Sequence, residues 1–219
     1  MSAEEKEASA FSLVATLGVA GFLAGLFIVG IYQITDPVIK ANEAAELHEA
    51  VFKVVPGSSQ LQALALDNGS VKPLAHGDEA EHVIFAAYDA AGTFKGYAVP
   101  AQGPGFQDVI RLIYGFDTST GKTTGMQVLA SKETPGLGDK IIKDQHFVGQ
   151  FTSRTFDGGE LLAAKSGEGT LPQHVDTITG ATISSKAVIR IMNETQSLWK
   201  DAYPAPGAEP ALAAPAEGE

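Results

Sequence analysis

The sequence predicts an α+β domain, an antiparallel sheet packed with helices, preceded by one N-terminal transmembrane helix. Three observations lead to this fold class. Residues 11–34 form an apolar stretch without a charge. Segments of β-type composition between residues 82 and 130 are separated by short turns, as in hairpins. Two amphipathic segments, residues 139–151 and 183–199, show helical spacing of apolar residues, and each can cover part of a sheet face.

The apolar stretch predicts a membrane anchor. Its 24 residues, Phe11 to Ile34, would extend about 36 Å as a helix at about 1.5 Å per residue, which is enough to cross a bilayer. A cleaved signal peptide would have a shorter apolar region, a basic start and a cleavage site after it. The start MSAEEKEASA is more acidic than basic, and IYQITDPV offers no cleavage site. We therefore expect a retained anchor.

A separate helix is expected after the anchor. The pair Asp36-Pro37 is typical of a helix start, and the Pro-Gly pair at positions 56 and 57 is typical of an end. Between them, apolar residues and glutamates alternate with helical spacing. Residues 35–57 are therefore predicted to form a linker helix.

The soluble domain is placed at residues 58–203. Its predicted strands are residues 82–89, 93–101, 108–117 and 122–130. Residues 58–80 show no pattern that we can assign. The last segment, residues 204–219, consists mostly of Ala, Pro and Glu without periodicity, which predicts a disordered tail.

Composition excludes several functions. A net charge of −11 without a basic run excludes nucleic-acid binding. The absence of cysteine excludes thiolate-bound iron–sulfur clusters, thiol catalysis and disulfides. The five histidines lack metal-binding spacing, so no metal site is expected. No GxSxG motif occurs, and GKTT at residues 121–124 is not a P-loop because Phe116 stands where its first glycine belongs. No catalytic residue is therefore predicted.

Small and hydroxyl residues precede the strongest predicted helix, in the segment DTITGATISSK at residues 176–186. One interpretation is a helix cap. In that case Asp176, Thr179 and Thr182 only satisfy the free N–H groups of the first helical turn. Such residues are ordinary before a helix, and the spacing alone favours this interpretation.

The other interpretation of this segment is a phosphate site. A helix N-terminus presents unpaired N–H groups and a partial positive charge, which stabilise a phosphate without a cluster of arginines. Gly180 and Ala181 would leave the approach open, and Lys186 would add a full charge one turn into the helix. The residues by themselves leave both interpretations open.

Residues 176–184, DTITGATIS, resemble the Asp-x-x-(Ser/Thr)-Gly-Ala-(Ser/Thr)-x-(Ser/Thr) motif of FMN-binding domains. Residues 133–140, ETPGLGDK, resemble a segment of the G subunit of Rnf electron-transport complexes and, in similar form, of the C subunit of the Na⁺-translocating NADH:quinone reductase. The two motifs stand in the same order as in that family, and the resemblance extends over roughly residues 11–200. Two matching motifs make the resemblance specific.

The resemblance implies a covalent flavin. A flavin transferase would use FAD to attach FMN through its phosphate to Thr182, and the ETPGLGDK loop would border the isoalloxazine ring. The cofactor-binding residues that it implies are Thr182, Asp176, Thr179, Gly180, Ala181, Ser184, Ser185, Lys186, Glu133, Thr134, Leu137 and Gly138.

The resemblance also implies a function, namely the relay of electrons within a membrane complex that couples ferredoxin:NAD oxidoreduction to ion transport. The expected partners are the other membrane subunits and the transferase, and no independent turnover is expected. The soluble domain would face the periplasm or the exterior of an inner membrane, with residues 1–10 in the cytoplasm. The alternatives are the C subunit of the quinone reductase, and an anchored sensor or scaffold domain whose TGAT is only a helix cap.

Overall fold

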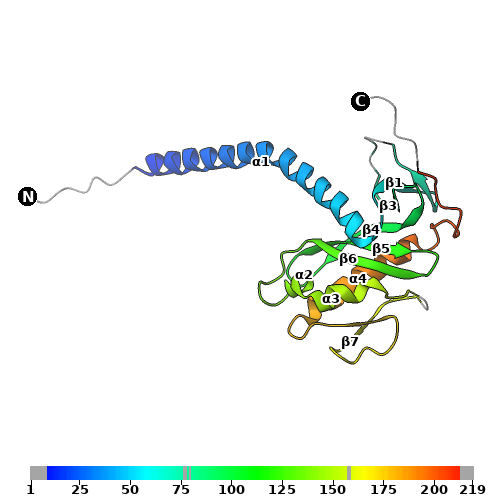
Figure 1. Ribbon diagram of the computed structural model, residues 1–219. Coiled ribbons are helices and arrows are strands. Elements are labelled where there is room, and N and C mark those ends of the chain that lie inside the picture. The colour runs from blue at the N-terminus through cyan, green and yellow to red at the C-terminus, as the bar shows by residue number, and fades with distance from the viewer. Residues whose placement is uncertain (1–8, 76–77, 79, 157–158, 213–219) are drawn as a thin grey trace, which may run out of the picture. The chain divides into compact units, whose positions relative to one another are not determined.

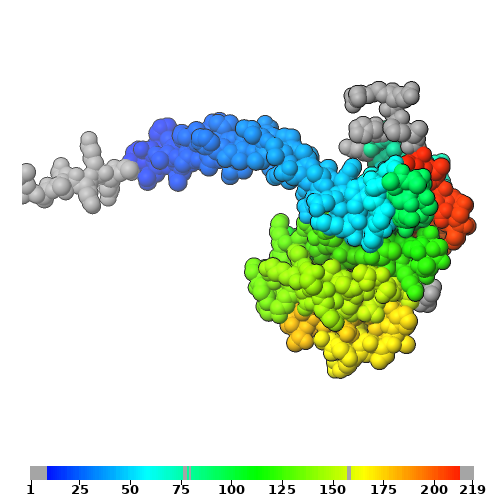
Figure 2. All heavy atoms as spheres, viewed as in Figure 1, coloured from blue at the N-terminus to red at the C-terminus, as the bar shows by residue number. Residues whose placement is uncertain are grey.

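The computed structural model describes residues 9–75, 78, 80–156 and 159–212. The chain divides into two compact units, Met1–Ala45 and Glu46–Glu219. The first unit consists of the greater part of helix α1 (Ala10–Val54). An 18-residue window of this helix has a mean hydropathy of 2.3, with none of it buried, so the helix is long and apolar enough to cross a membrane. Figure 2 shows its side chains, in blue, uncovered.

The prediction of a separate linker helix is wrong, because α1 is continuous and Pro37 lies inside it. An internal proline removes one backbone hydrogen bond and costs roughly 3 kcal/mol. Two side-chain interactions flank the proline. Thr35 donates its hydroxyl to the carbonyl oxygen of Ile31, and Lys40 pairs with Asp36 at 2.8 Å, one turn apart. The predicted end near residue 56 is close to the observed end at Val54.

The second unit is built on a six-stranded sheet (Figure 1), which confirms the predicted fold class. Every pair of neighbouring strands is antiparallel, and the order is β2-β1-β3-β4-β5-β6. The strands are β1 (Gln60–Asp67), β2 (Ser70–Pro73), β3 (Val83–Tyr88), β4 (Phe94–Pro104), β5 (Val109–Asp117) and β6 (Lys122–Ala130).

The β1–β2 hairpin lies within residues 58–80, where no element was predicted. Its turn is Asn68-Gly69, with φ angles of 49° and 79°. Positive φ at both central residues is what a two-residue hairpin turn of type I′ requires, and Asn-Gly is a pair that readily accepts it. The signal was therefore present in the sequence, flanked by the alternating segment QLQALALD.

Each face of the sheet is covered by a helix. The end of α1 packs on one face, where Val51 and Val54 are buried in a cluster that includes Ile113. Helix α4 (Thr182–Trp199) packs on the other face, in the cluster that contains Leu112 and Tyr114, and appears in orange in Figure 1. Residues 112–114 alternate between the two clusters because successive side chains of a strand point to opposite faces.

The predicted helix over residues 139–151 is interrupted. It consists of α2 (Lys140–Lys143), α3 (Gln145–Gly149) and a 3₁₀ turn (Gln150–Thr152). Asp144 has an extended ψ of 100° and accepts hydrogen bonds from the backbone N–H groups of His146 and Phe147. It therefore ends one helix and caps the next, a role that the periodicity of apolar residues does not reveal.

Two short strands, β7 (Leu162–Ala164) and β8 (His174–Asp176), form a parallel pair just before the TGAT segment. They were not predicted. The prediction of a disordered tail is wrong for residues 204–212, because the Tyr88 hydroxyl donates to the Pro210 carbonyl oxygen at 2.5 Å and Leu212 packs against the core. Residues 1–8 and 213–219 lie outside the described residues.

Candidate functional site

Helix α4 begins at Thr182 itself, and its N-cap residue is Ala181, which makes no side-chain cap hydrogen bond. Gly180 has φ +82°, a conformation that suits glycine. The Thr182 side chain is exposed, and its hydroxyl lies 3.5 Å from the Ile178 carbonyl oxygen, at the limit of a hydrogen bond. The helix-cap interpretation therefore does not explain this threonine.

The N-terminus of α4 presents free backbone donors. The first backbone bond of the helix runs from the Ser185 N–H to the Ala181 carbonyl oxygen at 2.9 Å. The N–H groups of residues 182–184 precede it and have no intrahelical acceptor, as in the first turn of any α-helix. An anion is stabilised at such a position by these donors and by the helix dipole.

A pocket of about 280 Å³ lies beside Thr182 and brings the two sequence motifs together. Glu133, Thr134, Leu137 and Gly138 line it from the loop after β6. Residues 180–184 line it from the start of α4, and Phe106 lines it from the β4–β5 loop. Eight of the twelve residues expected at the site thus lie in this one pocket or in its walls: Glu133, Thr134, Leu137, Gly138, Gly180, Ala181, Thr182 and Ser184.

Glu133 joins the three segments that form the pocket. It is 5 % exposed, and its Oε1 accepts hydrogen bonds from the backbone N–H groups of Phe106 and Gln107 at 2.8 and 2.9 Å. Its Oε2 accepts a hydrogen bond from the Ser184 hydroxyl. Burial raises the pKa of Glu133, but the bonds from Ser184 and from the two N–H groups outweigh it and hold the pKa below its ordinary value.

Two glycines make room for this carboxylate. A Cβ at Gly105 would overlap Glu133 Oε1, and a Cβ at Gly138 would lie 2.6 Å from Glu133 Oε2 and 2.8 Å from Ser184 Oγ. Such separations are shorter than real contacts of a Cβ atom. Gly105 and Gly138 are therefore required by packing, whereas Gly136, in the same loop as Gly138, has a positive φ of +77° and a Cβ there would meet no atom within 4 Å.

The rim of the pocket is apolar and exposed. Phe106, Leu137 and Ile183 line it with 63 %, 52 % and 61 % of their surfaces accessible. Phe106 was not predicted, because an aromatic residue in a glycine-rich loop carries no spacing signal. Three large apolar side chains around one opening provide a surface that a flat, apolar ring would cover.

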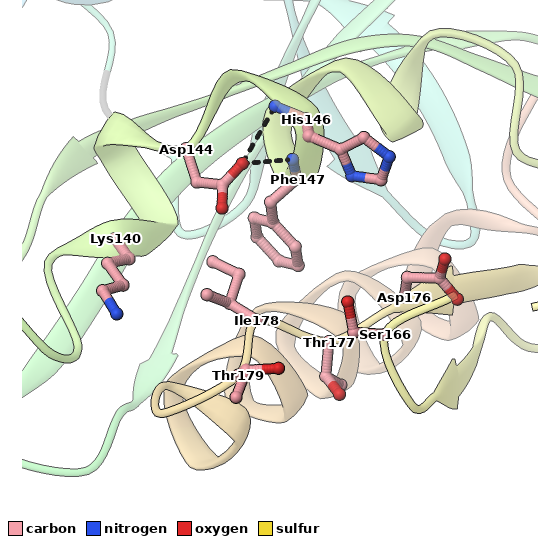
Figure 3. A pocket seen from close by; sticks show the side chains of 9 residues that line it. All are labelled: Lys140, Asp144, His146, Phe147, Ser166, Asp176, Thr177, Ile178 and Thr179. Atoms are coloured by element: carbon pink, nitrogen blue, oxygen red, sulfur yellow. Dashed lines mark hydrogen bonds between the residues drawn. The ribbon is translucent and has the colours of Figure 1, made fainter. Parts of the chain in front are cut away.

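Four predicted residues lie outside this pocket. Asp176 and Thr179 line a neighbouring pocket of about 290 Å³ together with Lys140 and His146 (Figure 3). The Asp176 carboxylate accepts hydrogen bonds from the N–H groups of residues 167 and 169, so it fixes a preceding loop and does not cap α4.

The other two are in α4. Ser185 is fully buried and forms hydrogen bonds with the backbone. Its hydroxyl accepts from the Ile178 N–H at 3.1 Å and donates to the Ala181 carbonyl oxygen at 2.9 Å. Lys186 lines a different pocket, together with Arg190 and Glu194. The lysine closer to the TGAT turn is Lys140, whose Nζ would lie 3.8 Å from a Cβ at Gly180.

Comparison with known proteins identifies the family to which the chain belongs. Residues 105–197 match the FMN-binding domain, a range that includes both motifs. The G subunit of the ion-translocating oxidoreductase complex of Methanosarcina acetivorans is 30 % identical over 186 residues, which cover 81 % of this chain and 87 % of that protein. The chain belongs to this family of G subunits.

A second relative in the G-subunit family comes from Clostridium ljungdahlii. It is the G subunit of a proton-translocating ferredoxin:NAD⁺ oxidoreductase complex, and it is 28 % identical over 194 residues, 89 % of this chain and 94 % of that protein. The family resemblance stated from the two motifs is thereby confirmed over most of the chain.

Two solved structures share the fold of this chain. NqrC of Shewanella oneidensis superposes with a TM-score of 0.58 at 22 % identity, over 70 % of this chain and 91 % of that one. The C subunit of the Na⁺-translocating NADH-quinone reductase of Parabacteroides distasonis gives a TM-score of 0.57 at 17 % identity, over 74 % of this chain and 94 % of that one. The likeness shows the fold.

The pocket beside Thr182 fits FMN, the cofactor that the matched domain supports. Its apolar rim would suit the ring, and the free N–H groups in the first turn of α4 would suit the phosphate. The apolar helix and the relatives from membrane complexes together support a membrane-anchored protein.

Proposed function

We propose that this chain is the electron-transfer subunit of a membrane-bound, Rnf-type ferredoxin:NAD oxidoreductase complex, and that it carries FMN as a phosphoester of Thr182. The observation that carries the proposal is the state of the Thr182 hydroxyl. Thr182 is exposed, it does not cap helix α4, and it lines the pocket in which both motifs meet. The names of the G-subunit relatives support the complex, and the matched domain supports FMN.

Different residues of the chain bind the phosphate and the ring of FMN. The N–H groups of residues 182–184 receive the phosphate, and Lys140 adds a positive charge near Gly180. Phe106, Leu137 and Ile183 cover the ring and exclude water from it. The bound flavin supplies electron transfer, one or two electrons at a time, while the protein sets its position and potential.

Attachment requires a transferase partner with FAD. The Thr182 oxygen forms a bond to the phosphorus of the FMN half, the phosphoanhydride bond to AMP breaks, and the hydroxyl proton passes to a base of the transferase. The exposure of Thr182 makes this attack sterically feasible. A tether replaces bulk flavin by a high effective concentration at the pocket, which suits a domain on the periplasmic or outer side of the membrane.

Intact mass after denaturation tests the proposal directly. The chain, expressed with its transferase, should be heavier by one FMN less water, and digestion should place the added mass on the peptide with Thr182. Thr182→Ala should abolish the adduct, and Thr182→Ser should retain it because the hydroxyl is kept. An unmodified wild-type chain from native membranes, or an adduct that survives in Thr182→Ala, contradicts the proposal.

A second candidate is the C subunit of the Na⁺-translocating NADH:quinone reductase, because two such subunits share the fold of this chain. It would carry the same flavin linkage on the same fold. Purification of the complex from its own membranes and identification of the neighbouring subunits separates the two candidates.

A further inference from the structure

Among the residues that line the pocket beside Thr182, Glu133 bears the formal charge. The other lining residues that the structure describes are glycine, alanine, hydroxyl or apolar residues. A carboxylate in a pocket proposed to receive a phosphate and a redox ring is unexpected. It repels the phosphate and any negative charge that the ring gains on reduction, so its presence needs a physical reason.

The position of this charge is fixed. Both oxygens of Glu133 are engaged, Oε1 with two backbone N–H groups and Oε2 with Ser184. Gly105 and Gly138 lie against the same carboxylate, since a Cβ at either position would come within 2.6 Å of one of its oxygens. The hydrogen bonds and the close packing therefore hold the carboxylate in the wall of the pocket.

The hydrogen bonds to Glu133 also do not neutralise its charge. All three donors are neutral groups, so they stabilise the carboxylate without cancelling it. The lowered pKa of Glu133 keeps it ionised at neutral pH. Because the carboxylate is buried, water screens it less than it screens a surface charge.

We propose that Glu133 sets the reduction potential of the flavin bound in this pocket and lowers it by its fixed negative charge. Reduction adds two electrons to the ring. When a single proton is taken up from solvent, the reduced ring keeps one negative charge. A nearby anion disfavours this gain of negative charge. A low potential suits a carrier that receives electrons from a strong reductant. This inference rests on the proposed function, because it requires a flavin at Thr182.

The decisive variant is Glu133→Gln in the full-length, flavinylated chain. Glutamine has the same shape, its oxygen still accepts from Phe106 and Gln107, and its amide donates to Ser184, whose hydroxyl can turn to accept. The charge is removed and the hydrogen bonds remain. Spectroelectrochemical titration of the flavin should give a more positive midpoint potential than in the wild type.

Two controls separate charge from structure. Glu168→Gln removes the same charge from an exposed loop and should leave the potential at the wild-type value. Ser184→Ala removes a hydrogen bond but keeps the carboxylate, so its shift should be smaller than that of Glu133→Gln. Equal shifts in Ser184→Ala and Glu133→Gln would assign the effect to packing and overturn the inference.

The outcomes distinguish this inference from the proposed function. A wild-type chain without the FMN adduct defeats the proposed function. A flavinylated Glu133→Gln chain with an unchanged or more negative potential defeats only the inference. If Glu133→Gln does not fold or accept flavin, Gln107→Glu provides the second test, because it adds a charge at an exposed position beside Glu133. Its potential should become more negative, and an unchanged or more positive value overturns the inference.

Discussion

Ser184 donates its hydroxyl hydrogen to a carboxylate oxygen of Glu133 at 2.5 Å, across 51 positions of sequence. Both residues are buried. Because Ser184 stands in the first turn of α4, the bond ties the start of the helix that bears Thr182 to the loop that follows β6. The shape of the candidate flavin pocket therefore depends on a contact between the two motifs.

Ser184→Ala should destabilise the fold by about 1.5 to 3 kcal/mol, since it removes a hydrogen bond to a buried charge. Denaturant unfolding of the full chain in detergent measures this loss. Ser197→Ala on the exposed side of the same helix is the matched control and should change stability by less than about 0.5 kcal/mol. Equal stability of the two variants would show that the buried bond contributes nothing.

The stabilisation by Glu133 should depend on pH. The pKa of Glu133 in the folded state lies below its ordinary value of 4.5. The stabilisation is therefore complete above that value and is lost as pH falls through the folded-state pKa. The difference in unfolding free energy between wild type and Glu133→Gln should be constant near neutral pH and shrink below about pH 4.5. A difference that grows in acid would contradict this assignment.

Gly138→Ala should damage both stability and flavin loading. The new Cβ would lie 2.6 Å from Glu133 Oε2, and the surrounding groups are held by hydrogen bonds, so overpacking of about 1 to 3 kcal/mol is expected. The melting temperature and the flavin absorbance per chain measure the two effects. Gly149→Ala, where a Cβ meets nothing within 4 Å, should fold and load normally.

Gly115→Ala tests the packing of the end of α1 on the sheet. Its Cβ would overlap the Val54 carbonyl oxygen and Thr124 Oγ1. Because the clash is with backbone, the end of α1 must move to relieve it. We therefore expect the free energy of unfolding to fall by about 1 to 3 kcal/mol. At Gly125 the same helix end is 3.1 Å away, so Gly125→Ala should lose less. Thermal unfolding of both variants ranks them, and the reverse order would refute this packing.

Tyr88→Phe tests whether the segment after Tyr203 is held to the domain. The change removes the hydrogen bond from the Tyr88 hydroxyl to the Pro210 carbonyl oxygen and should cost about 1 kcal/mol. Limited proteolysis should then cut residues 204–212 faster than in the wild type. Equal cleavage rates would indicate that this segment is free in both proteins.

Local patterns in the chain were sufficient to establish the apolar helix, the four strands between residues 82 and 130, and the identity of the two motifs. Period-2 and period-3.6 patterns and turn residues act over a few positions, so they can be read without a partner. The Asn68-Gly69 hairpin turn belongs to the same class, because an Asn-Gly pair is a local signal for a two-residue turn.

The folded structure was needed for everything that depends on contacts between distant segments. It shows Phe106 and Thr182 in one pocket, and it identifies the donors to Glu133. It also shows that Asp176 binds a preceding loop and that Pro37 lies inside a continuous helix. Hydrogen bonds and close packing depend on distance in space, and no spacing along the chain encodes them. The sequence alone was sufficient to identify Thr182 as the candidate attachment site. Only the fold shows that the Glu133 carboxylate is buried in the same pocket.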